Sequence, residues 1–206
     1  MQQQLEIMLS MQNDMNTKVN TDWVTKGFAW YRAIWIESAE MLDHYGWKWW
    51  KKQTPDIDQV VLELVDIWHF GLSILILEGA KADAIEAKLQ TSLSQTGDKE
   101  FGEALEQFVA VTLQTKSFDI EGFAALMNTI NLSFDELYVR YVGKNVLNFF
   151  RQDHGYKDGS YRKEWGGRED NEHLVELSSS LDSAASDYKD RLYSALKERY
   201  DETAPA

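Results

Sequence analysis

Apolar residues recur every three to four positions along most of this chain, which is the spacing that places them on one face of an α-helix. The first segment illustrates it with an apolar stripe that runs from Leu5 through Met8 to Met15. We find no stretch with the alternating pattern of a β-strand, no internal repeat and no glycine-rich phosphate loop. The pattern therefore predicts an all-α protein.

Several helix ends are marked by residues with clear preferences. Gly46 is a typical stop, and Thr54-Pro55-Asp56 combines a capping hydroxyl, a first-turn proline and an acid at the positive end of a helix dipole. The less patterned residues 78–120 predict one or two helices. The other predicted helices span residues 1–20, 28–45, 54–77, 121–130, 133–152 and 172–199, with a break at 21–27 and a polar loop at 153–171.

The chain has 206 residues, of which 44% are hydrophobic, so it can bury a sizeable core. We expect one domain over residues 1–206. In this domain, residues 1–77 and 121–199 are predicted to form a rigid helical bundle, and residues 78–120 a more variable and mobile helical region.

The charge and cysteine content narrow the class of protein. A net charge of −13 argues against general binding to nucleic acid or to anionic membranes, and the absence of cysteine excludes disulfides and thiolate metal sites. The N-terminus lacks the features of a signal peptide, and the nearly apolar run from Ile67 to Leu77 is too short to cross a bilayer. We therefore expect a soluble protein of the cytoplasm, with no nucleic-acid or membrane partner.

Two pairs of acidic residues lie inside the most apolar stretches of the chain. Glu37 and Glu40 are three residues apart, as are Glu63 and Asp66, so each pair projects from one face of its helix. Burying four carboxylates close together is costly unless a positive charge compensates them. Ligation by oxygen alone favours Mg²⁺ or Mn²⁺, and two pairs indicate more than one ion. The pairs therefore predict a metal-binding core.

Two other interpretations of these acids are possible. Most isolated Glu-x-x-Glu patterns lie on solvated helix faces, but the neighbours of these pairs are too apolar for an exposed face. Asp66 and His69 have the acid-x-x-His spacing of di-iron bundles, which requires a second such motif. Glu40 and His44 have the wrong spacing to supply it.

Basic residues are concentrated near the C-terminus. Residues 140–168 hold seven lysines and arginines against three acids, although the whole chain is strongly acidic. Lys144, Asn148 and Arg151 share one helix face, and a glycine-containing basic loop follows them. Arginine and lysine suit phosphate oxygens, so a basic segment opposite a metal site is what polyphosphate chemistry requires. The alternative is a solvated loop that pairs with the acidic surface.

Aromatic and amide side chains supply a candidate base site. Trp47, Trp49 and Trp50 crowd the loop between the two acidic helices, where a ring could stack on a nucleobase or simply pack at the helix junction. Gln12 and Asn16 are four residues apart on the first helix, so their amides could bind the edge of a base or lie at the surface.

Together these segments resemble the all-α, dimeric dUTPases of some bacteria, phages and kinetoplastids, which belong to a wider superfamily of Mg²⁺-dependent nucleotide pyrophosphatases. The acidic pairs alone are typical of the superfamily, whereas the Trp-Lys-Trp-Trp-Lys and Gly-Tyr-Lys-Asp-Gly-Ser-Tyr segments are specific to the dUTPases. The resemblance covers residues 8–16, 30–70 and 143–163, followed by Glu169-Asp170-Asn171.

The resemblance implies a role for each matching residue. Glu37, Glu40, Glu63 and Asp66 would hold two or more Mg²⁺ ions, for which Mn²⁺ can substitute, and Glu40 would also orient or deprotonate the attacking water. Asp66 and Phe70 would disfavour a ribose 2′-hydroxyl. The residues expected around uracil are Gln12, Asn16, Trp49 and Asn148, and those expected at the phosphates are Lys144, Arg151, Tyr156, Lys157, Lys163 and Asn171.

The implied function is hydrolysis of dUTP, and of dUDP, to dUMP with release of pyrophosphate or phosphate by a homodimer. Such an enzyme limits uracil in DNA and supplies dUMP. Two alternatives stay open at this point: a related all-α pyrophosphatase that acts on another deoxynucleotide, and a phage-type protein that binds a partner such as a repressor. Residues 78–120 are the expected surface for a protein partner.

Overall fold

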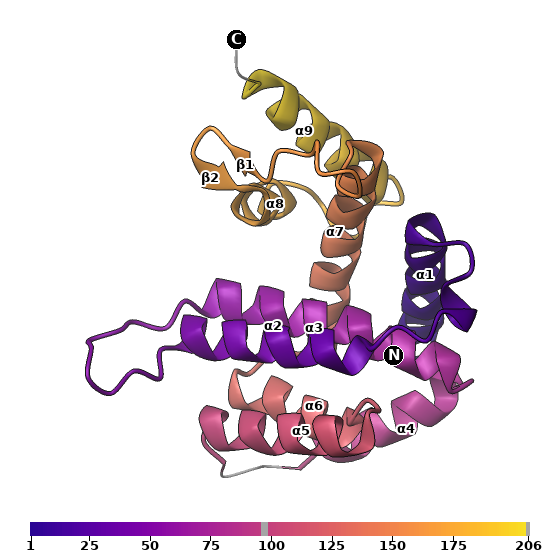
Figure 1. Ribbon diagram of the computed structural model, residues 1–206, viewed down its shortest axis with the longest axis vertical. Coiled ribbons are helices and arrows are strands. Elements are labelled where there is room, and N and C mark those ends of the chain that lie inside the picture. The colour runs from indigo at the N-terminus through magenta and orange to yellow at the C-terminus, as the bar shows by residue number, and fades with distance from the viewer. Residues whose placement is uncertain (96–98, 205–206) are drawn as a thin grey trace.

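The computed structural model describes residues 1–95 and 99–204, and within them the regular secondary structure is almost entirely helical, which confirms the all-α prediction (Figure 1). Its elements in chain order are α1 (Gln2–Val19), the 3₁₀ turn η1 (Trp23–Thr25), α2 (Trp30–Tyr45), α3 (Ile57–Leu77), α4 (Ala82–Leu93), α5 (Phe101–Thr115), α6 (Ile120–Thr129), α7 (Phe134–Asp153), β1 (Glu164–Trp165), β2 (Arg168–Glu169), α8 (Asp170–Ser179) and α9 (Tyr188–Glu202).

The helices are arranged in three levels in Figure 1. Helices α2 and α3 lie side by side in the middle, and α4, α5 and α6 cover them below. Helices α7, α8 and α9 and the short hairpin lie above, and α1 packs against α3, α4 and α7 at one end. Residues 78–120 contain two helices, α4 and α5, as predicted. The mobility predicted for them remains a prediction.

Helix α3 is the centre of the core. Apart from the stripe that carries Glu63 and Asp66, most of its circumference is apolar and buried, and so apolar a helix is stable in water only when other elements cover it. Leu62, Val65 and Leu72 are buried, and the buried Trp68 ring stacks on Phe123 with centroids 4.9 Å apart. By length and composition α3 could span a membrane, but 78% of its apolar window is buried inside this structure, as in the core helix of a globular protein.

The ends of the helices that carry the acidic pairs are determined locally. Gly46 ends α2 in the left-handed conformation, with φ of 88°, as expected. The predicted start of α3 is wrong by a few residues: Asp56 is its N-cap, and the Asp56 side chain accepts a hydrogen bond from the Gln59 backbone. Residues Thr54 and Pro55 precede the helix, because an aspartate caps as well as a threonine does.

The C-terminal part of the chain differs from the prediction of one helix over 172–199. Helix α8 ends at Ser179 and α9 begins at Tyr188. The intervening segment is rich in serine and aspartate, and the Asp182 carboxylate accepts a hydrogen bond from the Ala184 backbone. Such short polar side chains compete with helical hydrogen bonds, so the chain turns and α9 packs back on α7.

The polar loop after α7 contains a small hairpin that the sequence pattern did not predict. Strand β1 pairs antiparallel with β2, and the turn between them consists of Gly166 and Gly167, with φ of 58° and 83°. Two consecutive positive φ values are typical of the tight primed turns of hairpins, which favour Gly-Gly. Strands of two residues are too short for an alternating pattern, so this Gly-Gly pair was the available signal.

We predict that Gly71→Ala destabilises the protein by about 1–3 kcal/mol, the usual cost of overpacking a core. A Cβ at Gly71 on α3 would lie 2.5 Å from the ring of Phe118. Urea denaturation measures the change. Gly102→Ala on α5 is the matched control, because no described atom outside its own helix backbone lies within 4 Å of the added Cβ. Equal stabilities of the two variants would contradict this account of the core.

Candidate active site

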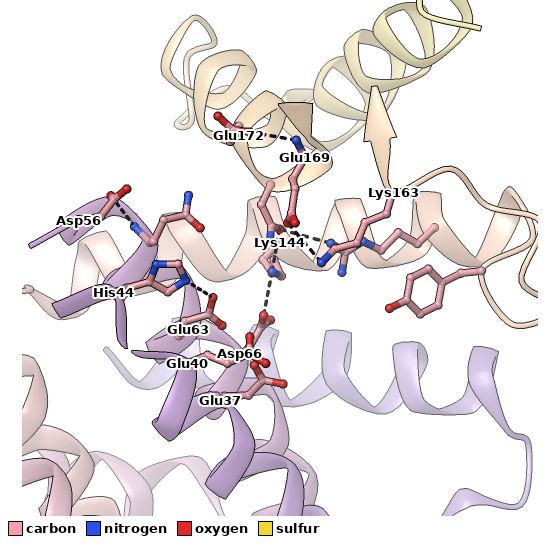
Figure 2. Close-up of a pocket in the computed structure, with 14 residues that line it drawn as sticks. Glu37, Glu40, His44, Asp56, Glu63, Asp66, Lys144, Lys163, Glu169 and Glu172 are labelled. Carbon is pink, nitrogen blue, oxygen red and sulfur yellow. Dashed lines mark hydrogen bonds and ion pairs between the residues drawn. The ribbon is translucent and has the colours of Figure 1, made fainter. Parts of the chain in front are cut away.

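A cavity of about 560 Å³ lies between the middle and upper levels of the fold (Figure 2). Acidic residues of α2 and α3 form one side, and α7, α8 and the loop between them form the other. Its lining residues are Glu37, Glu40, His44, Asp56, Gln59, Glu63, Asp66, Lys144, Arg151, Tyr156, Lys163, Glu169, Asn171 and Glu172. Nine of the residues to which the sequence analysis assigned a role are among them. Side chains from helices that are distant in the chain therefore lie together around one cavity.

Three carboxylates form the centre of the acidic side. Glu37 of α2 and Glu63 and Asp66 of α3 each place one oxygen so that the three oxygens lie within 4.8 Å of one another. Glu40 lines the same cavity but lies outside this trio and is exposed. The four carboxylates predicted to form a metal-binding core are therefore arranged as a close group of three with Glu40 beside it.

The crowding of these acids changes their protonation. Burial, together with the neighbouring charges of Asp66 and Glu63, raises the pKa of Glu37 to about 8. Burial and the charge of Asp66 also raise the pKa of Glu63, although the Lys144 ammonium opposes that rise. Both effects have the same origin, because like charges in a partly dry site disfavour ionisation. Without a bound cation, ionisation of these carboxylates therefore lowers the stability of the folded protein.

Lys144 of α7 is the link between the two sides. Its side chain is only 1% exposed, and its Nζ lies 2.8 Å from Asp66 Oδ2 and donates to Asn171 Oδ1 at 2.9 Å (Figure 2). The resemblance predicted a phosphate contact for this lysine. In the structure the ammonium group pairs with an acid of the trio and still lines the cavity.

The basic side is built on Arg151, near the C-terminal end of α7. Its guanidinium pairs with the Asp170 carboxylate, and one of its nitrogens reaches Asn171 Oδ1 at 3.3 Å. Lys163 lines the cavity from the segment before the hairpin, where its Nζ lies 3.2 Å from Glu169 Oε2. The tight loop between them turns at Gly155, which has φ of 89° and where a side chain would clash with the Ser160 hydroxyl.

The predicted amide pair lies in a buried polar network beside the cavity lining. The Gln12 amide donates to Asn16 Oδ1 at 2.9 Å and to Ser73 Oγ at 3.2 Å, and the Asn16 amide donates to Ser73 at 2.9 Å. Gln12 Oε1 lies 2.6 Å from His69 Nδ1 and accepts from the Tyr141 hydroxyl. These amides are buried and satisfied by one another, so the surface interpretation is wrong for both.

His69, the histidine of the acid-x-x-His pattern, lies in this buried network. Burial lowers the pKa of His69 to about 4, so the ring is neutral near pH 7. The ring stacks on Tyr141 with centroids 4.3 Å apart. His69 does not belong to the group of three carboxylates, which argues against the di-iron interpretation.

The remaining predicted residues lie outside the cavity lining. Trp49 is 89% exposed, in the α2–α3 loop, which Figure 1 places at the opposite end of the α2–α3 pair from α1. Phe70 is partly buried and packs near Trp30, and Lys157 donates to the backbone carbonyl of Val19 at 2.8 Å. Asn148 is close to the site, because its Oδ1 accepts from Arg151 at 3.3 Å.

Two residues that support the site had no role assigned from the sequence. Asp170 is fully buried and accepts hydrogen bonds from Arg151, and Tyr161 donates to the same carboxylate at 2.8 Å. Asp170 occurs in the Glu169-Asp170-Asn171 segment that carried the resemblance. Its local pattern, an acid near a helix start, is indistinguishable from an ordinary capping residue.

The residues of the acidic side fit a hard divalent cation. Three clustered carboxylates offer oxygen ligands alone, which is the donor set of Mg²⁺ and Mn²⁺. Burial, together with the charges of neighbouring carboxylates, raises the pKa of Glu37 and of Glu63. A cation at this point would remove that imbalance.

Comparison with known protein families supports this geometry. No curated protein matches the chain. A family model described as dUTPase matches residues 4–156, roughly three quarters of the chain, and so includes both acidic pairs, Lys144, Arg151 and Tyr156. The chain therefore belongs to the dUTPase family, whose members are hydrolases that act on nucleotides.

Proposed function

We propose that this protein hydrolyses dUTP, and also dUDP, to dUMP with release of pyrophosphate or phosphate in a Mg²⁺-dependent reaction. One observation carries the proposal: a single cavity holds the trio of Glu37, Glu63 and Asp66 on one side and the cations Arg151 and Lys163 on the other. A polyphosphate chain requires both, since cations must neutralise its charge while a fixed set of groups positions it. Membership of the dUTPase family supports the choice of nucleotide.

Glu37, Glu63 and Asp66, with Glu40 beside them, are the ligands that we propose for two or more Mg²⁺ ions. When bound, such ions supply Lewis-acid neutralisation of the phosphate oxygens, and dUTPases of this family generally use a divalent metal. Glu40 is the candidate general base. It is exposed to the cavity, and no hydrogen bond or ion pair to its carboxylate occurs among the described residues, so it can orient or deprotonate a water molecule.

We assign the phosphates to Arg151, Tyr156, Lys163 and Asn171, with Lys144 between them and the acids. Lys157 would join them only on releasing the carbonyl that it now contacts. Asp66 and Phe70 would disfavour ribose. Uracil presents two carbonyls and one N–H, which amides can match, so Gln12, Asn16 and Asn148 would bind it with Trp49 stacked on its face. Because Gln12 and Asn16 bond to each other, base binding would exchange those bonds for bonds to the ligand.

We further propose that the protein works in the cytoplasm, where hydrolysis of dUTP limits the incorporation of uracil into DNA and supplies dUMP.

We predict that, of the deoxynucleoside triphosphates, only dUTP is turned over rapidly, with Mg²⁺ and not with EDTA. Measurement of phosphate and pyrophosphate release across dUTP, dUDP, dCTP, dTTP and dATP tests this. Hydrolysis of dCTP or dTTP as fast as dUTP would refute the substrate assignment.

We predict that Glu40→Gln lowers kcat at least about 100-fold, because Glu40 is the candidate general base. The thermal midpoint should not change, because the side chain is exposed. The control is Glu106→Gln, which replaces an exposed acid of α5 outside the cavity.

We predict that Glu37→Gln stabilises the metal-free protein while abolishing activity. The pKa of Glu37 is raised from the ordinary glutamate value of 4.5 to about 8 in the folded protein. The folded protein therefore loses stability as the pH rises from 4.5 towards 8, where Glu37 must ionise. Thermal unfolding in EDTA should therefore show a small difference between variant and wild type at pH 5 and a gain of a few degrees at pH 8.5. Glu106→Gln should show no such gain. A destabilised Glu37→Gln protein at pH 8.5 would contradict the proposed crowding.

We also propose that the protein is a homodimer that uses the outer face of α2. Trp35 and Ile36 are 50% and 52% exposed there, and large apolar side chains gathered on a surface are typical of interfaces. Ile36→Glu should convert the dimer to a monomer in light scattering, because a two-fold contact would bring like charges together. Leu77→Glu, at an exposed apolar position at the end of α3, should remain dimeric. A monomeric wild type would refute the proposal.

A further inference from the structure

Asp170, the first residue of α8, is one of the most deeply buried charged groups in the described chain, with a relative exposure of 0%. Its backbone N–H donates to the Lys163 carbonyl at 2.9 Å, which fixes α8 to the segment that carries Lys163. A carboxylate removed from water costs free energy unless charged or hydrogen-bonding partners surround it. Its partners therefore indicate what it is for.

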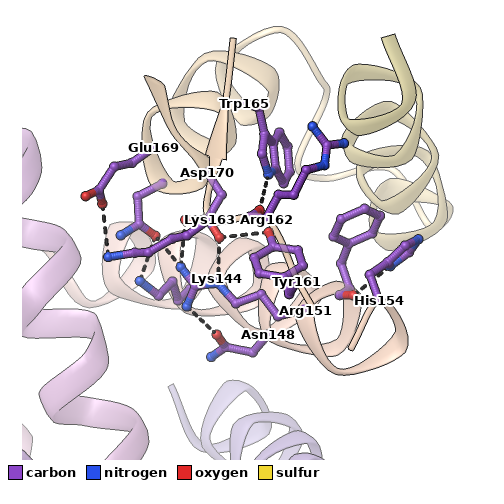
Figure 3. Close-up of polar contacts among 12 residues, drawn as sticks. Lys144, Asn148, Arg151, His154, Tyr161, Arg162, Lys163, Trp165, Glu169 and Asp170 are labelled. Atoms are coloured by element: carbon purple, nitrogen blue, oxygen red, sulfur yellow. Dashed lines mark hydrogen bonds and ion pairs between the residues drawn. The ribbon is translucent and has the colours of Figure 1, made fainter. Parts of the chain in front are cut away.

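Three hydrogen bonds satisfy this carboxylate (Figure 3). Arg151 donates from Nε to Oδ2 and from Nη2 to Oδ1, both at 2.8 Å, and the Tyr161 hydroxyl donates to Oδ2 at 2.8 Å. The paired bonds from one guanidinium are the bidentate geometry that sets orientation as well as distance. Burial acts to raise the pKa of Asp170, but the bonds and charge of Arg151 and the Tyr161 bond outweigh it and lower that pKa.

This geometry determines how Arg151 meets the cavity. Asp170 holds the Nε–Nη2 edge of the planar guanidinium, and the only partner of Nη1 among the described residues is Asn148 Oδ1, at 3.3 Å. A guanidinium has five N–H donors in one plane, so fixing one edge leaves the other edge in a set direction. Arg151 lines the cavity while Asp170 and Tyr161 do not. The Nη1 edge is therefore the one left for an anion.

Tyr161 is itself held in place from outside the cavity. Its ring lies parallel to that of Tyr200 on α9, with centroids 5.6 Å apart and an interplanar angle of 3°. The hydroxyl that contacts Asp170 is thus positioned by packing against the C-terminal helix, and it bonds the same carboxylate oxygen that accepts from Arg151 Nε.

We propose that Asp170 and Tyr161 are positioning residues for Arg151, holding its guanidinium so that the Nη1 edge binds a phosphate of the nucleotide polyphosphate. This inference rests on the proposed function, because it assigns Arg151 to phosphate. A merely structural carboxylate would hold α8 against α7, and its loss would lower stability without selecting between ligands. A positioning carboxylate affects the binding of phosphates and leaves the binding of a nucleoside alone.

The test measures dissociation constants by calorimetry for two probes, inorganic pyrophosphate with Mg²⁺ and 2′-deoxyuridine. Tyr161→Phe, which removes one hydrogen bond and keeps the ring, should weaken pyrophosphate binding about 3- to 10-fold. Asp170→Asn, which removes the charge, should weaken it by about 10- to 100-fold. Binding of deoxyuridine should change less than about twofold in both variants.

Two further variants separate positioning from general damage. Tyr193→Phe is the matched control, because the Tyr193 hydroxyl also donates to a carboxylate, Asp153, at 2.9 Å, but within the described residues that acid pairs with Lys18 and forms no hydrogen bond or ion pair with Arg151. It should bind pyrophosphate as the wild type does. In an Arg151→Lys background, adding Tyr161→Phe should cause no further loss, since residues that act through a common partner are not additive.

The outcomes distinguish this inference from the proposed function. If Tyr161→Phe is folded and binds pyrophosphate as tightly as the wild type, or loses deoxyuridine and pyrophosphate equally, the positioning role is refuted while the proposed function stands. If Asp170→Asn does not fold, Tyr161→Phe and the Arg151→Lys pair still decide the question. A wild-type protein that binds neither dUTP nor pyrophosphate refutes the proposed function, and the inference with it.

Discussion

The buried ammonium group of Lys144 joins the two sides of the cavity, and the arrangement of the surrounding helices depends on it. Its Nζ lies 2.8 Å from Asp66 Oδ2 on α3 and 2.9 Å from Asn171 Oδ1 on α8, while its own backbone belongs to α7. Burying a lysine is costly unless opposite charge and acceptors accompany it. Displacement of any one of the three helices would leave a buried polar group without its partner, so this contact fixes their relative positions.

The two sides of the cavity differ in how their charges are balanced. On the basic side, Arg151 and Asp170 compensate each other in a bidentate pair, and Tyr161 satisfies the same carboxylate. On the acidic side, three carboxylates lie close together beside one lysine, and burial together with their mutual repulsion raises the pKa values of Glu37 and Glu63. The buried charges of the Arg151–Asp170 pair are therefore balanced within the protein, whereas a bound cation would stabilise the carboxylates of the acidic side. Sites that store such an imbalance commonly exchange stability for function.

Much of the fold could be predicted from the sequence, because helices depend on local periodicity and on residues at their ends. The long apolar helix α3, its acidic pair and the stop at Gly46 all follow from neighbours within a few positions. The break between α8 and α9 was missed because Leu181, Ala184 and Ala185 continue the apolar spacing across a turn. The Gly166–Gly167 hairpin was missed because two-residue strands have no period.

The candidate site was predictable in its chemistry but only partly in its geometry. The sequence singled out nine of the residues that line the cavity, because carboxylates at helical spacing share a face and basic residues are concentrated in one segment. It placed Gln12 and Asn16 as a possible base site without indicating that they are bonded to each other and to Ser73. It also grouped Trp49 with them, although the loop that carries Trp49 projects from the far end of the α2–α3 pair.

By itself, then, the sequence determined the helical class, the pairing of acids along α2 and α3 and the presence of a phosphate-suited segment, because each is encoded within one or two helical turns. Only the tertiary structure decided that Glu40 lies beside the carboxylate trio, that Lys144 pairs with Asp66, and that Asp170 holds Arg151. Those contacts join residues separated by many turns of chain. They depend on how whole helices pack, and no local pattern records that information.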